Sequence, residues 1–265
     1  MPLLFKEVPQ EGASATAVSN GFVRFPHTPH LAWLGGGTPR DDKVLSLTEA
    51  NALLSGEVVV EEKVDGANLG LSLDTAGQLQ AQNRGQFLMT PIGGQFVRLP
   101  QWLAVHGDSL KAAMSSHLIM FGEWCAARHS LGYDRLPDWW LVFDVYDRDR
   151  GCFLPIATRN EMAMNIGLAV VAEVFRGHAT LSSLKRLLTD IPSRYRDGPM
   201  EGIVVRSASR DALVKRAKLV RPDFTQAIES HWRKRRIEWN RLDTDAPGVS
   251  ERLTGCLSPH PHGPA

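Results

Sequence analysis

Cysteine is scarce in this chain, and neither sign of charge is in clear excess. Three cysteines in 265 residues, with no CxxC pair, provide neither a disulfide framework nor a zinc site. A net charge of +1 gives no general attraction to nucleic acid or to a membrane surface. No apolar run approaches the ~20 residues that span a bilayer, and the N-terminus lacks the apolar core of a signal peptide. We therefore expect a cytoplasmic protein whose functional surface is local.

The composition divides the chain into four segments. Residues 1–21 have an irregular pattern, whereas residues 22–225 contain most of the periodic apolar positions and are long enough for one large domain. Basic residues cluster in 226–243, where apolar spacing predicts a helix over 223–242. Residues 244–265 are rich in Pro, Gly and His, which predicts a disordered tail.

Strand patterns outnumber helix patterns, mostly in an order that suits hairpins. A capping box formed by Ser46 and Glu49 starts a short helix that ends by Gly56. Alternating apolar residues in 58–60 and 69–73 flank an Asp-Gly pair, which predicts a hairpin. Other strands are expected over 78–82, 117–123, 140–146, 168–175 and 203–206, and helices over 110–116, 160–166 and 181–188. These patterns predict an α+β fold of antiparallel sheets with flanking helices.

A lysine ends the first strand of this expected hairpin. Lys63 stands in KVDG, where Asp65 and Gly66 follow it and Glu62 directly precedes it. A lysine amine is a covalent nucleophile when its surroundings favour the neutral form. Taken alone, the four-residue motif also fits an ordinary tight turn, so both interpretations stay open at this point.

Four further motifs follow in order along the chain. They are FGEW at 121–124, VFDVY at 142–146, EGIVV at 201–205 and VKRAK at 214–218. Each has an ordinary structural alternative, because acids at strand ends are often solvated and Phe143 suits a core position. Asp144 and Asp147 are expected to be solvated or to anchor loops. The order and spacing of the set therefore matter more than any one motif.

The ordered set resembles the covalent nucleotidyltransferase superfamily of ATP-dependent DNA and RNA ligases and mRNA capping enzymes. Within that superfamily the chain is most similar to RNA ligases, because of Glu62, Asn68 and Arg84. The upstream FPHTPHL also resembles a segment of some bacterial RNA ligases. The resemblance covers roughly residues 22–225 and implies that this segment is an adenylyltransferase catalytic domain. The implied fold is the nucleotidyltransferase (ATP-grasp-like ligase) fold.

The resemblance also implies a role for each motif residue. Lys63 would be the nucleophile that takes AMP from ATP. Asp65 and Lys218 would complete the catalytic set, and Glu201 would hold a Mg²⁺ or Mn²⁺ ion. The remaining implied positions bind the nucleotide: Glu62, Gly66, Asn68, Arg84, Glu123, Phe143, Lys215 and Arg216. Among these, Glu123 would accept hydrogen bonds from the ribose, and Phe143 would stack on the adenine.

The last motif departs from the family pattern of two lysines separated by one residue. Arg216 and Lys218 have that spacing, and Lys215 is a further candidate. Arginine binds phosphate but does not donate a proton as lysine can. The sequence leaves open whether Lys215 or Arg216 fills the first position.

The resemblance implies an ATP-dependent polynucleotide ligase that joins RNA with 5′-phosphate and 3′-hydroxyl ends. It would act through a lysyl-AMP intermediate and an adenylylated 5′ end. The stretch after the last motif is too short for the OB domain of DNA ligases and capping enzymes, so none is expected, and the basic helix over 223–242 would bind RNA instead. A minimal ATP-dependent DNA ligase and a catalytically inactive nucleic-acid-binding module are the alternatives. The oligomeric state stays open.

Overall fold

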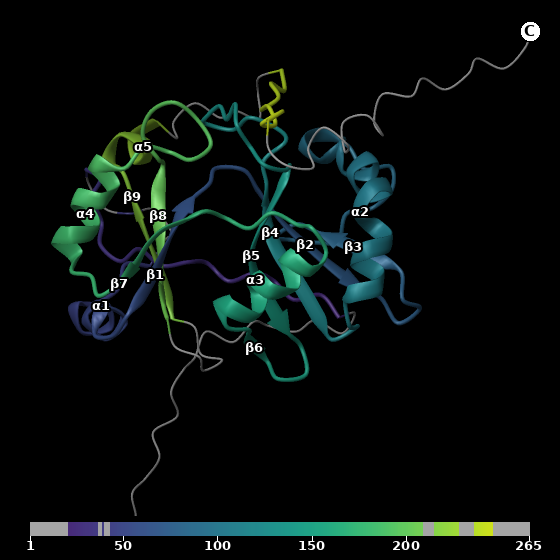
Figure 1. The fold of residues 1–265 in the computed structure, drawn as a ribbon, viewed down its shortest axis with the longest axis horizontal. Helices are drawn as coiled ribbons and strands as arrows, with labels where there is room; N and C mark the ends of the chain where they lie inside the picture. Colours follow the sequence, from purple (N-terminus) through teal and green to yellow (C-terminus); the bar gives the residue numbers. More distant parts are fainter. Residues whose placement is uncertain (1–20, 37–38, 40–42, 209–214, 228–235, 246–265) are drawn as a thin grey trace, which may run out of the picture.

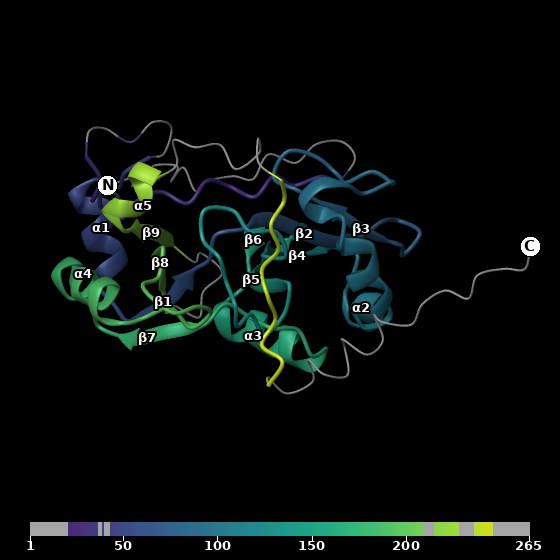
Figure 2. The ribbon, with the colours of Figure 1, turned by 90° about the horizontal axis from the view of Figure 1, so that it is seen from above.

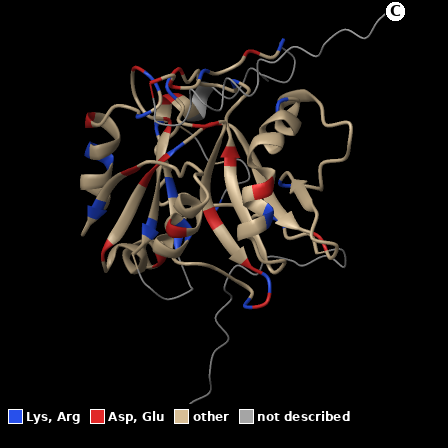
Figure 3. Ribbon diagram, turned by 45° about the vertical axis from the view of Figure 1, so that its right-hand side comes forward, with Lys and Arg blue, Asp and Glu red and all other residues tan. Residues whose placement is uncertain are grey.

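A computed structural model of the protein describes residues 21–36, 39, 43–208, 215–227 and 236–245. The expected irregular segment 1–21 and the expected tail 244–265 lie outside these ranges except at their inner ends. Lys and Arg intermingle with Asp and Glu throughout the described ribbon (Figure 3), as the near-neutral composition suggests. Any site for an anion must therefore be local.

Two antiparallel sheets lie side by side at the centre of the molecule (Figure 1). The first sheet has the order β7-β1-β8-β9 and the second has the order β3-β2-β4-β5-β6. The strands are β1 (Val58–Lys63), β2 (Ala67–Leu73), β3 (Leu79–Gln82), β4 (Leu118–Trp124), β5 (Trp140–Asp147), β6 (Cys152–Phe153), β7 (Glu173–Gly177), β8 (Gly202–Ser207) and β9 (Arg216–Val220). The predicted α+β fold of antiparallel sheets is confirmed, and all strands of the described residues belong to these two sheets.

Helices cover the outer face of each sheet (Figures 1 and 2). The helices are α1 (Leu47–Leu54), α2 (Leu99–Ala113), α3 (Ile156–Asn165), α4 (Leu181–Asp190) and α5 (Pro222–Ala227), with a 3₁₀ turn η1 (Gly94–Phe96). Apolar residues of α1 and α4, such as Leu53 and Leu184, share one core with Val58, Val60 and Ile203 of the first sheet. A second core joins α2 to the second sheet. The predicted capping box of α1 is present.

The predicted hairpin around Asp65-Gly66 is wrong. The strands β1 and β2 belong to different sheets, so the chain crosses from one sheet to the other at this point. Gly66 does not have a positive φ angle. A Cβ atom on Gly66 would instead lie 2.5 Å from the carbonyl oxygen of Trp124. The glycine is therefore required by close approach to the end of β4, rather than by a tight turn.

The predicted helix over 223–242 is confirmed only at its start. Residues 223–227 are helical as part of α5 (Pro222–Ala227), residues 228–235 lie outside the described ranges, and residues 236–243 form no helix but make isolated bridges through Trp239 and Leu242. Tertiary contacts with Ala127 and Leu136 override the helical spacing of this segment. Residues 233–235 of the basic cluster lie outside the described residues. Residues 236–243 are not helical, so they do not support the expected RNA-binding helix.

Three smaller expectations differ from the structure. The helix expected over 110–116 is the end of α2, which starts eleven residues earlier at Leu99. Within the strand expected over 168–175, Val170 makes a single bridge to Val142, and β7 begins at Glu173. Asp144 is buried rather than solvated, whereas Asp147 anchors a turn as expected by accepting the N–H groups of residues 149 and 150.

A network of buried charges joins the two sheets. Glu61 on β1 accepts hydrogen bonds from Arg159 of α3 at 2.6 Å and from Arg206 of β8 at 2.7 Å. Arg206 also donates to Asp144 on β5 at 2.8 Å, and Arg216 of β9 donates to the other oxygen of Asp144 at 3.1 Å. Because Asp144 belongs to the second sheet and its two arginines to the first, this carboxylate links the sheets directly.

Replacing Asp144 with asparagine should destabilise the protein strongly. The Asp144→Asn variant keeps the side-chain shape but leaves Arg206 and Arg216 without their shared counter-charge. Breaking a buried ion pair costs about 3 to 5 kcal/mol, and urea denaturation would measure this loss. Asp149→Asn, at an exposed position of the next turn, is the matched control. A loss as small as that of the control would contradict the proposed linking role.

Candidate active site

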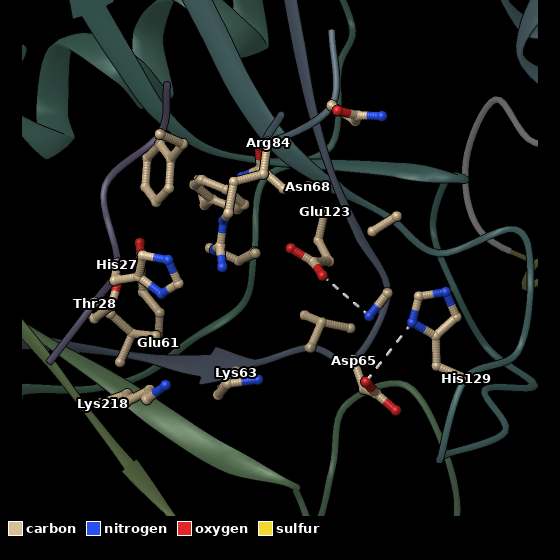
Figure 4. A pocket seen from close by; sticks show the side chains of 18 of the residues that line it. His27, Thr28, Glu61, Lys63, Asp65, Asn68, Arg84, Glu123, His129 and Lys218 are labelled. Atoms are coloured by element: carbon tan, nitrogen blue, oxygen red, sulfur yellow. Dashed lines mark hydrogen bonds and ion pairs between the residues drawn. The ribbon is translucent and has the colours of Figure 1, made fainter. Parts of the chain in front are cut away.

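A cavity of about 570 Å³ lies between the two sheets and is lined by residues of both (Figure 4). Its size is typical of a small-molecule site. Nine of the residues expected from the sequence line it: Glu62, Lys63, Asp65, Gly66, Asn68, Arg84, Glu123, Phe143 and Lys218. Motifs that are far apart in the chain are therefore brought together.

None of the helices in the described part of the chain has both the length and the apolar character needed to span a bilayer.

Lys63 ends β1 and projects into the cavity. Its Nζ atom donates to Oε1 of Glu201 at 2.6 Å, and this glutamate directly precedes β8. Burial by itself would lower the pKa of the Lys63 amine, but the carboxylates of Glu201 and Asp65, with a smaller effect of Glu123, outweigh it and raise that pKa. In this arrangement the lysine is therefore held in its protonated form.

Asp65 is anchored by the loop that follows β4. Its Oδ2 atom accepts the N–H groups of Ser130 at 2.7 Å and Leu131 at 3.1 Å. Its own N–H donates to the hydroxyl of Tyr133 at 2.8 Å. These bonds hold the backbone of KVDG against the loop, so the local role of Asp65 is to fix the position of the crossing segment.

Glu123 faces the cavity from β4. Its Oε1 atom accepts the N–H of Gly66 at 3.1 Å. Burial raises the pKa of Glu123 to about 7; the charges of Asp65 and Glu201 add to this effect, while Lys63 and Arg84 oppose it. A carboxyl group with such a pKa can accept or donate a hydrogen bond near neutral pH.

Several polar atoms at this site have no hydrogen-bond partner among the described residues. They include both amide atoms of Asn68, the Nε of Arg84 and the Oε2 of Glu201, all of which are buried. Buried polar groups in folded proteins are nearly always bonded. These atoms therefore fit a site that binds a polar ligand.

One part of the cavity wall is apolar. Phe143, Val171 and Val204 line it. The ring of Phe143 also contacts Phe25, with the two ring centroids 5.1 Å apart in an edge-on arrangement. A flat aromatic group has apolar faces that match such a wall. Lys218 lies next to this part of the cavity, because it pairs with Val204 across β8 and β9.

Three of the expected binding residues are already engaged or lie outside the cavity. Each oxygen of the Glu62 carboxylate is already bonded to the protein, because one accepts the hydroxyl hydrogen bond of Ser193 and the other accepts the N–H of Arg194. The Arg216 guanidinium is bound to Asp144 and lies over an aromatic ring. Lys215 is exposed and does not line the cavity. Lys218 is the basic residue of the last motif that lines the cavity.

The cavity is also lined by residues to which the sequence assigned no individual role. His27 and Thr28 belong to FPHTPHL, which stood out by resemblance alone. Gln95 and His129 line another part of the wall, and their side chains are 2.8 Å apart. His129 also lies 4.0 Å from Asp65. These residues come from connecting segments, whose positions depend on the tertiary structure.

A divalent ion at this site would need ligands from the substrate. No group of three or more His, Cys, Asp or Glu side chains among the described residues is arranged to hold a metal by itself. Glu201 offers one unpartnered oxygen beside Lys63. Mg²⁺ typically binds through one or two carboxylates together with phosphate oxygens and water. The residues present therefore fit an ion that arrives with a phosphate compound.

Comparisons with known proteins identify the family of the chain and proteins of similar fold. Residues 56–220 match the family model described as RNA ligase. An archaeal ATP-dependent RNA ligase has a similar structure (TM-score 0.52, 19% identity, 76% of this chain and 48% of that chain). A Naegleria gruberi RNA ligase solved with PPi is also similar (TM-score 0.53, 14% identity, 84% of this chain and 64% of that chain). The chain thus spans about half of the archaeal protein. The curated proteins contain no match.

The raised pKa of Glu123 should make this residue destabilising at alkaline pH. Its folded pKa of about 7 lies above the ordinary glutamate pKa of 4.5, so stability is lost as pH rises through about 4.5 to 7. Glu123→Gln should remove this loss and be more stable than the natural protein at pH 8 but not at pH 4, by about 3 kcal/mol. Urea denaturation at both pH values measures the difference. An equal effect at both pH values would contradict the prediction.

Proposed function

The chain belongs to the RNA ligase family, and we propose that it is an ATP-dependent RNA ligase that joins 5′-phosphate and 3′-hydroxyl ends. The observation that carries this proposal is the half-buried pair of Lys63 and Glu201, 2.6 Å apart, in which Lys63 lines the cavity together with Glu123. A lysine amine that can lose its proton, a carboxylate with an unpartnered oxygen and an apolar wall suit attack on a nucleotide phosphate.

The proposed reaction has three steps. The Nζ atom of Lys63 attacks the α-phosphorus of ATP, a P–N bond forms, and pyrophosphate leaves. An oxygen of the RNA 5′-phosphate then attacks the same phosphorus, which breaks the P–N bond and regenerates the lysine. Finally the 3′-hydroxyl of the other end attacks the activated 5′-phosphate, forms the phosphodiester and releases AMP.

Each part of the nucleotide has a matching part of the cavity. We propose that the adenine lies against Phe143 and Val204 and that the ribose hydroxyls donate to Glu123. Arg84 and Lys218 supply positive charge for the phosphates. Asn68 has both a donor and an acceptor without a partner, which suits a polar contact with the nucleotide or the RNA end.

A Mg²⁺ or Mn²⁺ ion bound at Glu201 would offset phosphate charge. It would also neutralise the carboxylate that raises the pKa of Lys63. A related Naegleria gruberi RNA ligase variant was solved with ATP and Mn. The Lys63 amine must lose its proton before it attacks. The Glu201 charge opposes loss of the Lys63 proton, so neutralising that charge makes the loss easier. Burial of the amine also favours loss of the proton.

The two alternatives make different demands on this site. A binding module that has lost catalysis has no use for a half-buried lysine paired with a glutamate, because removing such a pair from water is costly. A minimal DNA ligase would use the same nucleotide site, so these residues do not separate it from an RNA ligase. Nicked duplexes in which each strand is RNA or DNA in turn would distinguish the two.

Lys63→Ala should abolish covalent labelling by ATP and leave the fold intact. The variant should still join RNA whose 5′ end is already adenylylated, because that final step does not need the amine as a nucleophile. Denaturing gels after incubation with α-labelled ATP measure the first effect, and sealing assays measure the second. Lys43→Ala, at an exposed ion pair, should label normally. Acid-labile labelling of Lys63→Ala at the natural level would show that the nucleophile is misassigned.

Glu201→Gln should weaken the use of divalent metal. Losing the carboxylate should reduce labelling at limiting Mn²⁺ by about tenfold to a hundredfold, with partial recovery at higher Mn²⁺. Glu57→Gln, at an exposed position before β1, is the control and should show the natural metal dependence. Excess EDTA should stop labelling of every variant. Full labelling in EDTA would exclude the metal role.

A further inference from the structure

Residues 236–243, called here the C-terminal strap, lie outside the family match at 56–220 but pack against the loop that anchors Asp65. The strap is the yellow segment near the end of β4 in Figure 1, and it crosses the middle of Figure 2. It lies between two arms of the loop over 125–136. Its backbone bonds to residues 126 and 128 on one side and to residues 133 and 136 on the other.

The side chain of Asn240 ties the strap to both arms. Its Nδ2 donates to the carbonyl oxygens of Cys125 at 2.7 Å and Ala127 at 3.4 Å. Its Oδ1 accepts the N–H of Tyr133 at 2.9 Å. The residue is 4% exposed. An asparagine amide supplies a donor and an acceptor at one position, and both are used here.

The part of this loop over residues 130–133 is hydrogen-bonded to Asp65 in the KVDG segment that carries Lys63. The Tyr133 hydroxyl accepts the N–H of Asp65. The carboxylate of Asp65 accepts the N–H groups of Ser130 and Leu131. A chain of hydrogen bonds therefore runs from the buried Asn240 through Tyr133 to Asp65, two residues from Lys63. The strap is also held at Trp239, whose ring lies 4.1 Å from the Arg98 guanidinium.

We propose that the C-terminal strap is part of the adenylylation centre and that Asn240 is a positioning residue for the attack by Lys63. Asn240 acts through Tyr133, which holds the backbone of Asp65. This inference rests on the proposed function. It places a required element beyond residue 225, the end of the catalytic domain that the sequence resemblance implies.

The physical basis is the cost of misplacing a nucleophile. Displacing a reacting group by about 1 Å can reduce a rate a hundredfold. Without Asn240, two carbonyl oxygens and one N–H group of the loop lose a buried partner. The loop would then shift to find other partners, and the backbone that carries Lys63 would shift with it. Binding of ATP depends on other parts of the cavity and should change less.

The test is a double-mutant cycle on the rate of Lys63 labelling. The variants are Asn240→Ala, Tyr133→Phe and the double variant, with Ile237→Ala as a control at an exposed position of the strap. Labelling is followed in rapid-quench experiments over a range of ATP concentrations and normalised to the final labelled fraction. Circular dichroism melting confirms that each variant is folded at the assay temperature. Asn240→Ser replaces Asn240→Ala if the latter fails to fold.

Each single variant should lower the rate at saturating ATP about tenfold or more, with little change in the ATP concentration for half-maximal rate. The double variant should lose less than the product of the two single losses, because both residues act on Asp65 in series. The control should label at the natural rate. Multiplicative losses, or a natural rate for Asn240→Ala, would overturn the inference. An unlabelled natural protein would instead overturn the proposed function.

Discussion

The buried charge network between the sheets is the constraint on which the rest of the structure depends. Charges removed from water must be fully bonded, or the protein does not tolerate their burial. Glu61 is bonded by Arg159 and Arg206, and Asp144 by Arg206 and Arg216. Because Arg206 donates to carboxylates of both sheets, the sheets must stay at the spacing that suits these bonds. The cavity is formed at that spacing.

The network and the nucleophile share one strand, so their positions are coupled. Along β1, successive side chains point to opposite faces. Glu61 and Lys63 therefore face the second sheet, where they line the cavity, while the Glu62 carboxylate binds Ser193 and the N–H of Arg194 on the other side. A strand with three consecutive charged residues is unusual for a buried position. Here each charge has a separate partner, and the charge network and the expected nucleophile share one face of the strand through Glu61 and Lys63.

Local patterns predicted most strands and helices but failed where distant contacts decided the outcome. The strands β4 and β5 were predicted to within a residue at most ends, because apolar and aromatic runs of this kind suit buried strands. The Asp-Gly signal wrongly predicted a hairpin, since a turn residue does not reveal whether the next strand returns to the same sheet. The helical spacing over 223–242 failed at 236–243 because the bonds of Asn240 to the loop outweigh a weak helix preference.

The sequence by itself determined the fold class and the family, and it identified the lysine, the acids and the basic residue that line the cavity, because these chemistries recur in ordered motifs. The tertiary structure decided which of them face one another. It paired Lys63 with Glu201 across the first sheet and assigned Arg216 to the charge network, and it brought His129 beside Asp65. These contacts join residues far apart in the chain, and their geometry depends on how two sheets pack, which no local pattern encodes.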